Sequence, residues 1–242
     1  MGWDINIIGK HGLRVDDIKH TAEDLSQILQ ANIKYGHETH DEFIEYGEIK
    51  LCSNAPLYVL SEYSDTNACA INNRNLISLS LEPADSADDR CEIFYLSIYQ
   101  EAFDLSFKND FFARWSGFYS HFREDGNTRT SCGLKEYRTL SKKYVKAFNC
   151  DKIYHIADQG PHQYIEDKLD SPWNEVLNYI NTKQYEKDFY KQHEEEFGRN
   201  YSEDDQGEES VVFDVASFMK ADHPKYSLSL YDVFVDDFSD LE

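Results

Sequence analysis

Two histidines and an aspartate near residue 160 are residue types that transfer protons or bind metals. His155, Asp158 and His162 follow a short apolar run and lie around a Gly-Pro turn. Strand ends of this kind often carry functional side chains, because rigid backbone presents them to solvent. The alternative is a turn in which Asp158 accepts hydrogen bonds from backbone amides. We favour the turn and keep a hydrolytic or metal-binding role for the three residues as the alternative interpretation.

A second candidate is a stripe of basic side chains at helical spacing. Lys135, Arg138, Lys142 and Lys146 fall on one side of a helical wheel, opposite Tyr137, Leu140, Tyr144 and Phe148. Such a stripe suits an acidic or phosphorylated ligand. It is also typical of a solvated helix face, which we favour.

Acidic residues gather in three blocks, and these are the third candidate. A loop holds Asp85, Asp88 and Asp89, and the end of the chain holds Asp232, Asp236, Asp237, Asp240 and Glu242. We expect the longest block to bind a partner; it consists of Glu194, Glu195, Glu196, Glu203, Asp204, Asp205, Glu208 and Glu209. Opposite charge on a partner would accelerate association and select among partners. Solubility alone explains the blocks equally well.

Motifs for metals and cofactors are missing from the chain. The segment His37–Glu42 has ligand types without the HExxH spacing, and no CxxC pair occurs. The turn Gly9–Gly12 is not a phosphate-binding loop, because it lacks the preceding glycine and the Ser or Thr that holds magnesium. We therefore assign no catalytic residue, expect neither metal nor cofactor, and lean against an enzyme.

The composition limits the kinds of partner that this protein is expected to bind. The chain has 242 residues with 24 Lys and Arg against 46 Asp and Glu, a formal net charge of −22. A surface this acidic repels phosphate, which disfavours direct binding of nucleic acid. No apolar run is long enough to cross a membrane, and five scattered cysteines are typical of reduced thiols in the cytoplasm. We expect a cytoplasmic protein that does not bind membranes.

The elements that must position these residues indicate an α+β fold with a mainly antiparallel sheet packed against several helices. Strands are expected at 3–8, 43–51, 57–63, 77–81, 91–99, 152–157, 211–215 and 227–235. Helices are expected at 21–33, 111–122, 134–148, 172–180 and 185–197. The pattern fits a single domain over 1–242 with a hinge at 123–133 and a mobile acidic segment at 198–210.

Four local details complete this prediction. Thr21 is expected to cap the first helix and Gly36 to end it. The strand at 91–99 carries apolar residues at odd and even positions, which favours burial of both faces. An aromatic stripe of Phe111, Trp115, Phe118 and Phe122 is typical of a helix facing the core. Ser171 is expected to cap the helix that begins near Pro172.

Three functions compete. The first is an acidic binding protein that neutralises a basic protein partner, in its most concrete form an immunity protein that blocks a bacterial toxin. The second is an enzyme or phosphate-binding module with its site at His155, Asp158 and His162 or at the basic stripe. The third is an inhibitor that mimics DNA, which requires regular rows of acids; the sequence shows clusters instead.

Overall fold

A computed structural model gives the fold of this protein. It describes residues 4–39, 42–51, 56–60, 69–71, 77–84, 93–108, 118, 132–197, 210–220 and 231–241. Most of the predicted hinge (123–131), most of the predicted mobile segment (198–209) and the loop acids Asp85, Asp88 and Asp89 lie outside these residues. Of the predicted aromatic stripe, only Phe118 is described; it is helical and buried.

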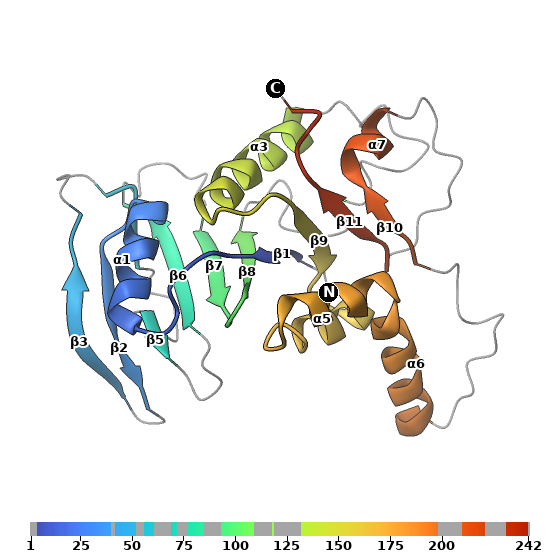
Figure 1. Ribbon diagram of the computed structural model, residues 1–242, viewed down its shortest axis with the longest axis horizontal. Helices are drawn as coiled ribbons and strands as arrows, with labels where there is room; N and C mark the ends of the chain where they lie inside the picture. The colour runs from blue at the N-terminus through green and yellow to red at the C-terminus, as the bar shows by residue number, and fades with distance from the viewer. Residues whose placement is uncertain are drawn as a thin grey trace.

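In the described part of the chain, eleven strands form one sheet in the order β10-β11-β9-β1-β8-β7-β6-β5-β2-β3, with β4 paired to β6 (Figure 1). The strands are β1 (Ile5–Lys10), β2 (Ile33–Glu38), β3 (Phe43–Ile49), β4 (Tyr58–Leu60), β5 (Cys69–Ile71), β6 (Ile77–Pro83), β7 (Ile93–Ile98), β8 (Ala102–Lys108), β9 (Ile153–Ala157), β10 (Val212–Asp214) and β11 (Val233–Asp236). The described pairings are antiparallel except β10–β11 and β2–β5. The predicted α+β fold with a mainly antiparallel sheet is confirmed.

Helices cover both faces of the sheet. Their bounds are α1 (Ile18–Leu29), α3 (Cys132–Ala147), α4 (Gln163–Glu166), α5 (Trp173–Asn181), α6 (Gln184–Phe197) and α7 (Val215–Lys220), with a 3-10 turn at Gly160–His162. Buried residues of α1, α3 and α7 belong to one apolar cluster, and those of α4, α5 and α6 belong to a second. The alternation of side chains along the strands separates the two clusters.

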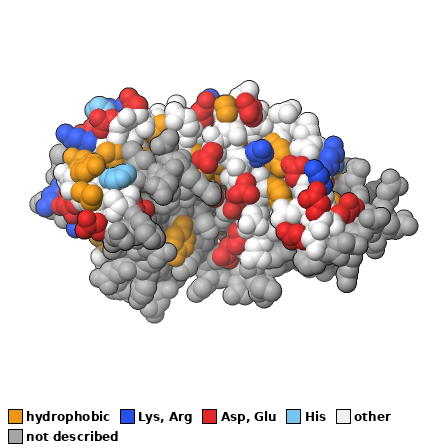
Figure 2. Space-filling view, turned by 90° about the horizontal axis from the view of Figure 1, so that it is seen from below, with side chains coloured by type: hydrophobic (Ala, Val, Ile, Leu, Met, Phe, Trp, Pro, Cys, Tyr) orange, Lys and Arg blue, Asp and Glu red, His pale blue; other side chains and the backbone are white. Residues whose placement is uncertain are grey.

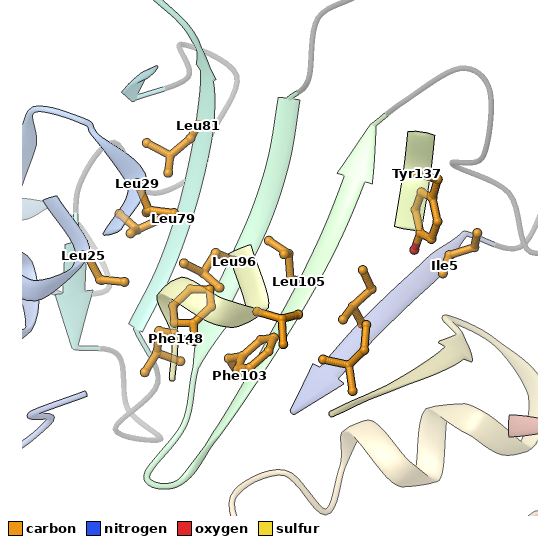
Figure 3. Close-up of a cluster of buried hydrophobic side chains, with 14 of the residues drawn as sticks. Ile5, Leu25, Leu29, Leu79, Leu81, Leu96, Phe103, Leu105, Tyr137 and Phe148 are labelled. Atoms are coloured by element: carbon orange, nitrogen blue, oxygen red, sulfur yellow. The ribbon is translucent and has the colours of Figure 1, made fainter. Parts of the chain in front are cut away.

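The strand β1 shows how that alternation works. Ile5 and Ile7 are buried in the first cluster and Ile8 in the second. The neighbouring strand β8 repeats the pattern, with Phe103 and Leu105 on the first face (Figure 3). Figure 3 shows Ile5, Phe103 and Leu105 together with Leu96 and with Phe148, which follows α3. The centre of the molecule is therefore a two-sided core around β1, β8 and β9.

The ends of α1 differ from the prediction. Asp17, not Thr21, caps the helix, and its carboxylate accepts hydrogen bonds from the backbone N–H groups of Lys19 and His20. The helix ends at Leu29, because Gln30 adopts a left-handed conformation with φ 52°. Gly36 lies inside β2, where an added Cβ would come within 2.2 Å of a backbone oxygen of β3. This close approach explains the glycine better than a helix stop does.

Two other expectations were wrong, and a strand of the core was not predicted. Strand β7 is not buried on both faces, because Tyr95 remains 38% exposed on one of them. Strand β8 was not predicted, although Phe103 and Leu105 alternate with Asp104 and Ser106 in the sequence. Helix α5 is preceded by Pro172 in extended backbone with no side-chain cap, so Ser171 does not cap it.

A substitution at Leu105 tests whether β8 belongs to the core. It is fully buried and pairs with Ile7 on one side and Leu96 on the other. Leu105→Ala is expected to lower the free energy of unfolding by about 3 kcal/mol, because it removes buried methyl groups and leaves a cavity. Ile44→Ala, at a 42% exposed position of β3, is the control and should cost less than about 1 kcal/mol. Urea denaturation measures both, and equal costs would contradict this core.

Candidate functional site

Two aspartates of the C-terminal acidic block, Asp236 and Asp240, contact α3, whereas Asp237 is exposed. Arg138 on α3 is 1% exposed and its guanidinium lies between two carboxylates of this block. Its Nε and Nη2 donate to Asp236 at 2.7 and 2.8 Å, and its Nη1 and Nη2 donate to Asp240 at 2.9 and 2.7 Å. We call this arrangement the Arg138 clamp. The two aspartates are occupied within the fold and are not an external surface for a partner.

Electrostatics make the clamp strong. Burial alone would raise the pKa of Asp236, but the hydrogen bonds from Arg138 and the neighbouring imidazole of His155 outweigh burial and hold this pKa well below its usual value. Burial would likewise lower the pKa of Arg138, whereas hydrogen bonds to Asp236 and Asp240 raise it. Bidentate pairs of guanidinium and carboxylate combine charge with fixed geometry. Both groups are therefore ionised inside the core.

The predicted basic stripe is divided by the fold. Arg138 is buried in the clamp, and Lys142 donates from Nζ to the backbone oxygen of Leu241 at 2.6 Å. Lys135 and Lys146 are exposed. Half of the stripe thus holds the C-terminal segment against α3, and an external anion would meet only the remaining lysines. The carboxylates of Asp236 and Asp240 already occupy the position at Arg138 that an external anion would take.

The residues of the predicted catalytic alternative do not converge on one point. His155 is fully buried beside Phe118 and Tyr137, and its Nε2 lies 3.5 Å from Asp236 Oδ2. His162 is also fully buried but packs against Tyr185, which belongs to the second apolar cluster. The two imidazoles therefore lie among different core clusters.

Hydrogen bonds fix the roles of His162 and Asp158. His162 Nδ1 accepts from the backbone N–H of Ala157 at 2.6 Å, so Nε2 carries the proton and donates to the backbone oxygen of Tyr231 at 2.9 Å. Burial lowers the pKa of His162 to about 4. Asp158 accepts from the backbone N–H of Asp4 at 2.8 Å. These contacts join β9 to neighbouring segments and leave neither ring nitrogen of His162 for a substrate.

A pair of carboxylates that the sequence analysis did not identify lies on the other face of the sheet. Asn6 of β1 donates from its amide nitrogen to Glu166 of α4 at 2.8 Å and to Asp104 of β8 at 3.2 Å. The second oxygen of Asp104 is buried without a hydrogen-bond partner among the described residues. Asp158 adds a third negative charge nearby. Asp104 interrupts an apolar strand at an alternating position, and that interruption was the available signal.

Burial governs the ionisation of this carboxylate pair. Desolvation raises the pKa of Glu166 well above the usual range, and the charges of Asp104 and Asp158 raise it further. Desolvation also raises the pKa of Asp104, against a smaller opposing effect of the hydrogen bond from Asn6. The pair therefore retains a proton at a pH where free carboxyl groups have lost theirs. Such groups are candidates for proton chemistry, although perturbed carboxyls are also found in purely structural networks.

The end of α6 is the described part of the predicted partner-binding block. Glu194, Glu195 and Glu196 lie on it, with Glu195 and Glu196 exposed and Glu194 half-buried. The remaining predicted residues lie outside the described part of the chain: Glu203, Asp204, Asp205, Glu208 and Glu209. We call the three described glutamates the acidic end of α6. Of the eight predicted partner-binding residues, these three are the ones that the structure describes.

The surroundings of this acidic end are open and polar. Figure 1 shows α6 extending away from the sheet. Glu195 and Glu196 line a hollow of about 420 Å³ together with Asp188, Lys191 and Gln192. Figure 2 shows the side of the molecule that lies at the bottom of Figure 1, where acidic side chains are spread over the centre and right with a few basic ones among them. The described side chains at the centre of this face are therefore mainly acidic.

The described residues offer neither a metal cluster nor a membrane-spanning helix. Within the described ranges, no three His, Cys, Asp or Glu side chains gather in a way that could hold a metal ion. None of the described helices is long and apolar enough to span a membrane. Comparison of the chain with protein-family models, curated proteins and solved structures finds no significant match.

The Arg138 clamp predicts a large loss of stability when the arginine is replaced. Arg138→Met leaves Asp236 buried without its cation and is expected to cost about 3–5 kcal/mol of unfolding free energy. Lys135→Met, at an exposed position of the same helix, is the matched control and should change little. Chemical denaturation at pH 7 measures both variants.

The same clamp predicts a pH dependence. The pKa of Asp236 is lower in the folded protein than its unfolded value of about 4, so the clamp stabilises the fold above that pH and loses this effect in acid. The difference in stability between wild type and Arg138→Met should therefore narrow as the pH falls below about 4. A difference that does not change with pH would contradict an ionised clamp.

The carboxylate pair predicts the opposite pH dependence. Because the folded protein raises the pKa of Glu166, its contribution is fully favourable below the unfolded value of about 4 and is lost as the pH rises. Glu166→Gln keeps the hydrogen bond from Asn6 without the charge. It should stabilise the protein by on the order of 1–2 kcal/mol at pH 9 relative to wild type, and by much less at pH 5.

Glu175→Gln is the control for this measurement, since Glu175 is exposed on α5. Thermal or urea denaturation across the pH range gives the comparison. A Glu166→Gln variant whose advantage over wild type fails to grow with pH would refute a proton held by the pair.

Proposed function

We propose that this protein binds and neutralises a basic protein partner through an acidic surface centred on the end of α6. The most concrete form of the proposal is an immunity protein that blocks a bacterial toxin in the cytoplasm. The observation that carries it is the state of Glu194, Glu195 and Glu196. No described lysine, arginine or histidine forms an ion pair with these three glutamates, and Glu196 accepts only from the neutral amide of Gln192.

Several other acids of the described chain differ in this respect. Asp24 pairs with Arg14, Glu45 with Lys34 and Glu101 with Lys10. The buried arginine is held by the two C-terminal aspartates. These pairs use cations of the chain on other parts of its surface and core. The acidic end of α6 is left to project its negative charge into solvent, where opposite charge on a partner raises the rate of association.

Aromatic side chains beside α6 supply contact area. Phe189 packs edge to face with Tyr164 and Tyr190, and its ring also lies 4.3 Å from that of His193. All four side chains are half-buried, so each presents part of its surface. Aromatic residues next to charged groups are enriched where protein interfaces concentrate their binding energy. The surface thus combines charge for attraction with rings for contact.

The DNA-mimic alternative finds less support. Consecutive residues on a helix are rotated by about 100°, so Glu194, Glu195 and Glu196 point in different directions around α6. A mimic of duplex DNA requires carboxylates in rows at phosphate spacing. The described acids of α6 form a cluster at one end instead. A compact cluster suits a local patch of Lys and Arg on a protein.

Capture of the partner tests the proposal. The full chain is immobilised, proteins of the native host are passed over it at low salt, and the bound protein is identified and purified. We expect a basic protein whose binding weakens as salt rises to physiological strength and beyond, where the Debye length falls below about 8 Å. Rescue of growth on co-expression of the partner with this chain would support the toxin form.

Charge neutralisation locates the surface. Replacing Glu194, Glu195 and Glu196 with Gln is expected to weaken binding about tenfold or more. The control variant Asp16→Asn, Glu42→Gln and Glu136→Gln removes the same number of exposed charges elsewhere and should change affinity little. An equal loss of affinity in both variants would show only a non-specific effect of net charge and would contradict a partner surface at the end of α6. Displacement of the partner by duplex DNA would favour the mimic instead.

A further inference from the structure

A hollow of about 370 Å³ lies where the end of β1, the connection from α3 to β9, and α5 meet. We call it the Trp173 hollow after the side chain that α5 contributes. Its volume lies in the range that small ligands occupy. It does not include any residue of the acidic end of α6.

The walls of the hollow are aromatic and apolar. The rings of Tyr154 on β9 and Trp173 on α5 meet edge to face with their centroids 6.0 Å apart. Both side chains are more than nine-tenths buried, and Leu177 one turn further along α5 lines the hollow beside them. A rigid pair of rings at the wall of a hollow favours a flat ring as the occupant, because aromatic groups stack or meet edge to face.

The rim of the hollow carries two lysines, which is unusual for a chain of net charge −22. Lys10 Nζ lies 3.5 Å from Glu101 Oε2, so part of its charge is compensated. Lys152 is exposed and forms no ion pair with any described carboxylate. The one acid on the rim is Asp151, which is exposed and adjacent to Lys152 in the chain.

Several other polar groups around the hollow are occupied. Glu101 also accepts from the backbone N–H of Trp173 at 3.3 Å, which ties it to the start of α5. His11 donates from Nε2 to the backbone oxygen of Tyr99 at 2.8 Å and accepts at Nδ1 from Leu13 N–H. Its ring is therefore neutral and fixed. Cys150 donates its thiol hydrogen to the backbone oxygen of Lys152. Lys152 remains as the cation that a ligand can engage.

We propose that the Trp173 hollow binds a small aromatic carboxylate, with the ring against Tyr154 and Trp173 and the carboxylate at the amines of Lys152 and Lys10. Aromatic walls and a cationic rim are complementary to an aromatic ring that carries one negative charge. This site is independent of the proposed binding of a basic protein, because the two share no residue.

Benzoate is the probe, and isothermal titration together with the indole N–H signals in ¹H–¹⁵N spectra are the measurements. Trp173→Phe assigns the signal of Trp173 among the three tryptophans of the chain. We expect benzoate at up to about 10 mM to saturate a shift of that signal. Benzamide has the same shape without the charge and should bind about tenfold more weakly, as should non-aromatic cyclohexanecarboxylate.

Variants of the rim and wall complete the test. Lys152→Gln should weaken benzoate binding about tenfold, and Leu177→Trp should abolish it by filling the hollow. Lys187→Gln, at an exposed position of α6, is the matched control and should leave binding unchanged. The proposal is overturned if the Trp173 signal does not move, if benzamide binds as tightly as benzoate, or if Lys152→Gln binds like the control.

Discussion

The guanidinium of Arg138 joins parts of the chain that are about a hundred residues apart in sequence, and the arrangement of the first core face depends on it. Asp236 and Asp240 hold α3 against the end of β11 and the residues that follow it. Burying an arginine and an aspartate is costly unless each charge is met by the other with good geometry. The four hydrogen bonds meet that condition. The C-terminal segment is thereby committed to the fold.

Because the fold uses some of its carboxylates internally, the net charge alone does not show which acids lie at the surface. A net charge of −22 suggests an acidic coat over the whole surface, yet several carboxylates serve the interior. Asp232 accepts from the backbone of Val211, Asp236 belongs to the clamp, and Glu166 shares Asn6 with Asp104. The acids available to a partner are those with no internal role, and the end of α6 contains three of them. The acidic surface that remains for a proposed partner is therefore smaller than the net charge suggests.

The two faces of the sheet use polar groups differently. On the face of α3, opposite charges meet and both remain ionised. On the face of α4, carboxylates meet one another around an amide, and burial keeps a proton on them. The first arrangement weakens in acid and the second weakens in alkali. Near the same second face, the Trp173 hollow is lined by two lysines and one aspartate, whereas the hollow at the end of α6 is lined by one lysine and three acids.

The sequence by itself determined the fold class, the helices α3, α5 and α6, and most strands, because hydrophobic spacing of two or near four residues follows directly from local backbone geometry. Strand β8 could also have been predicted from the sequence, since Phe103 and Leu105 alternate with polar neighbours. The tertiary structure alone decided which charges face inward. Arg138 looked like one member of a solvated stripe, and Asn6 and Glu166 are separated by 160 residues. Periodicity gives the face of an element that is buried; the order of strands in the sheet decides which side chains meet there.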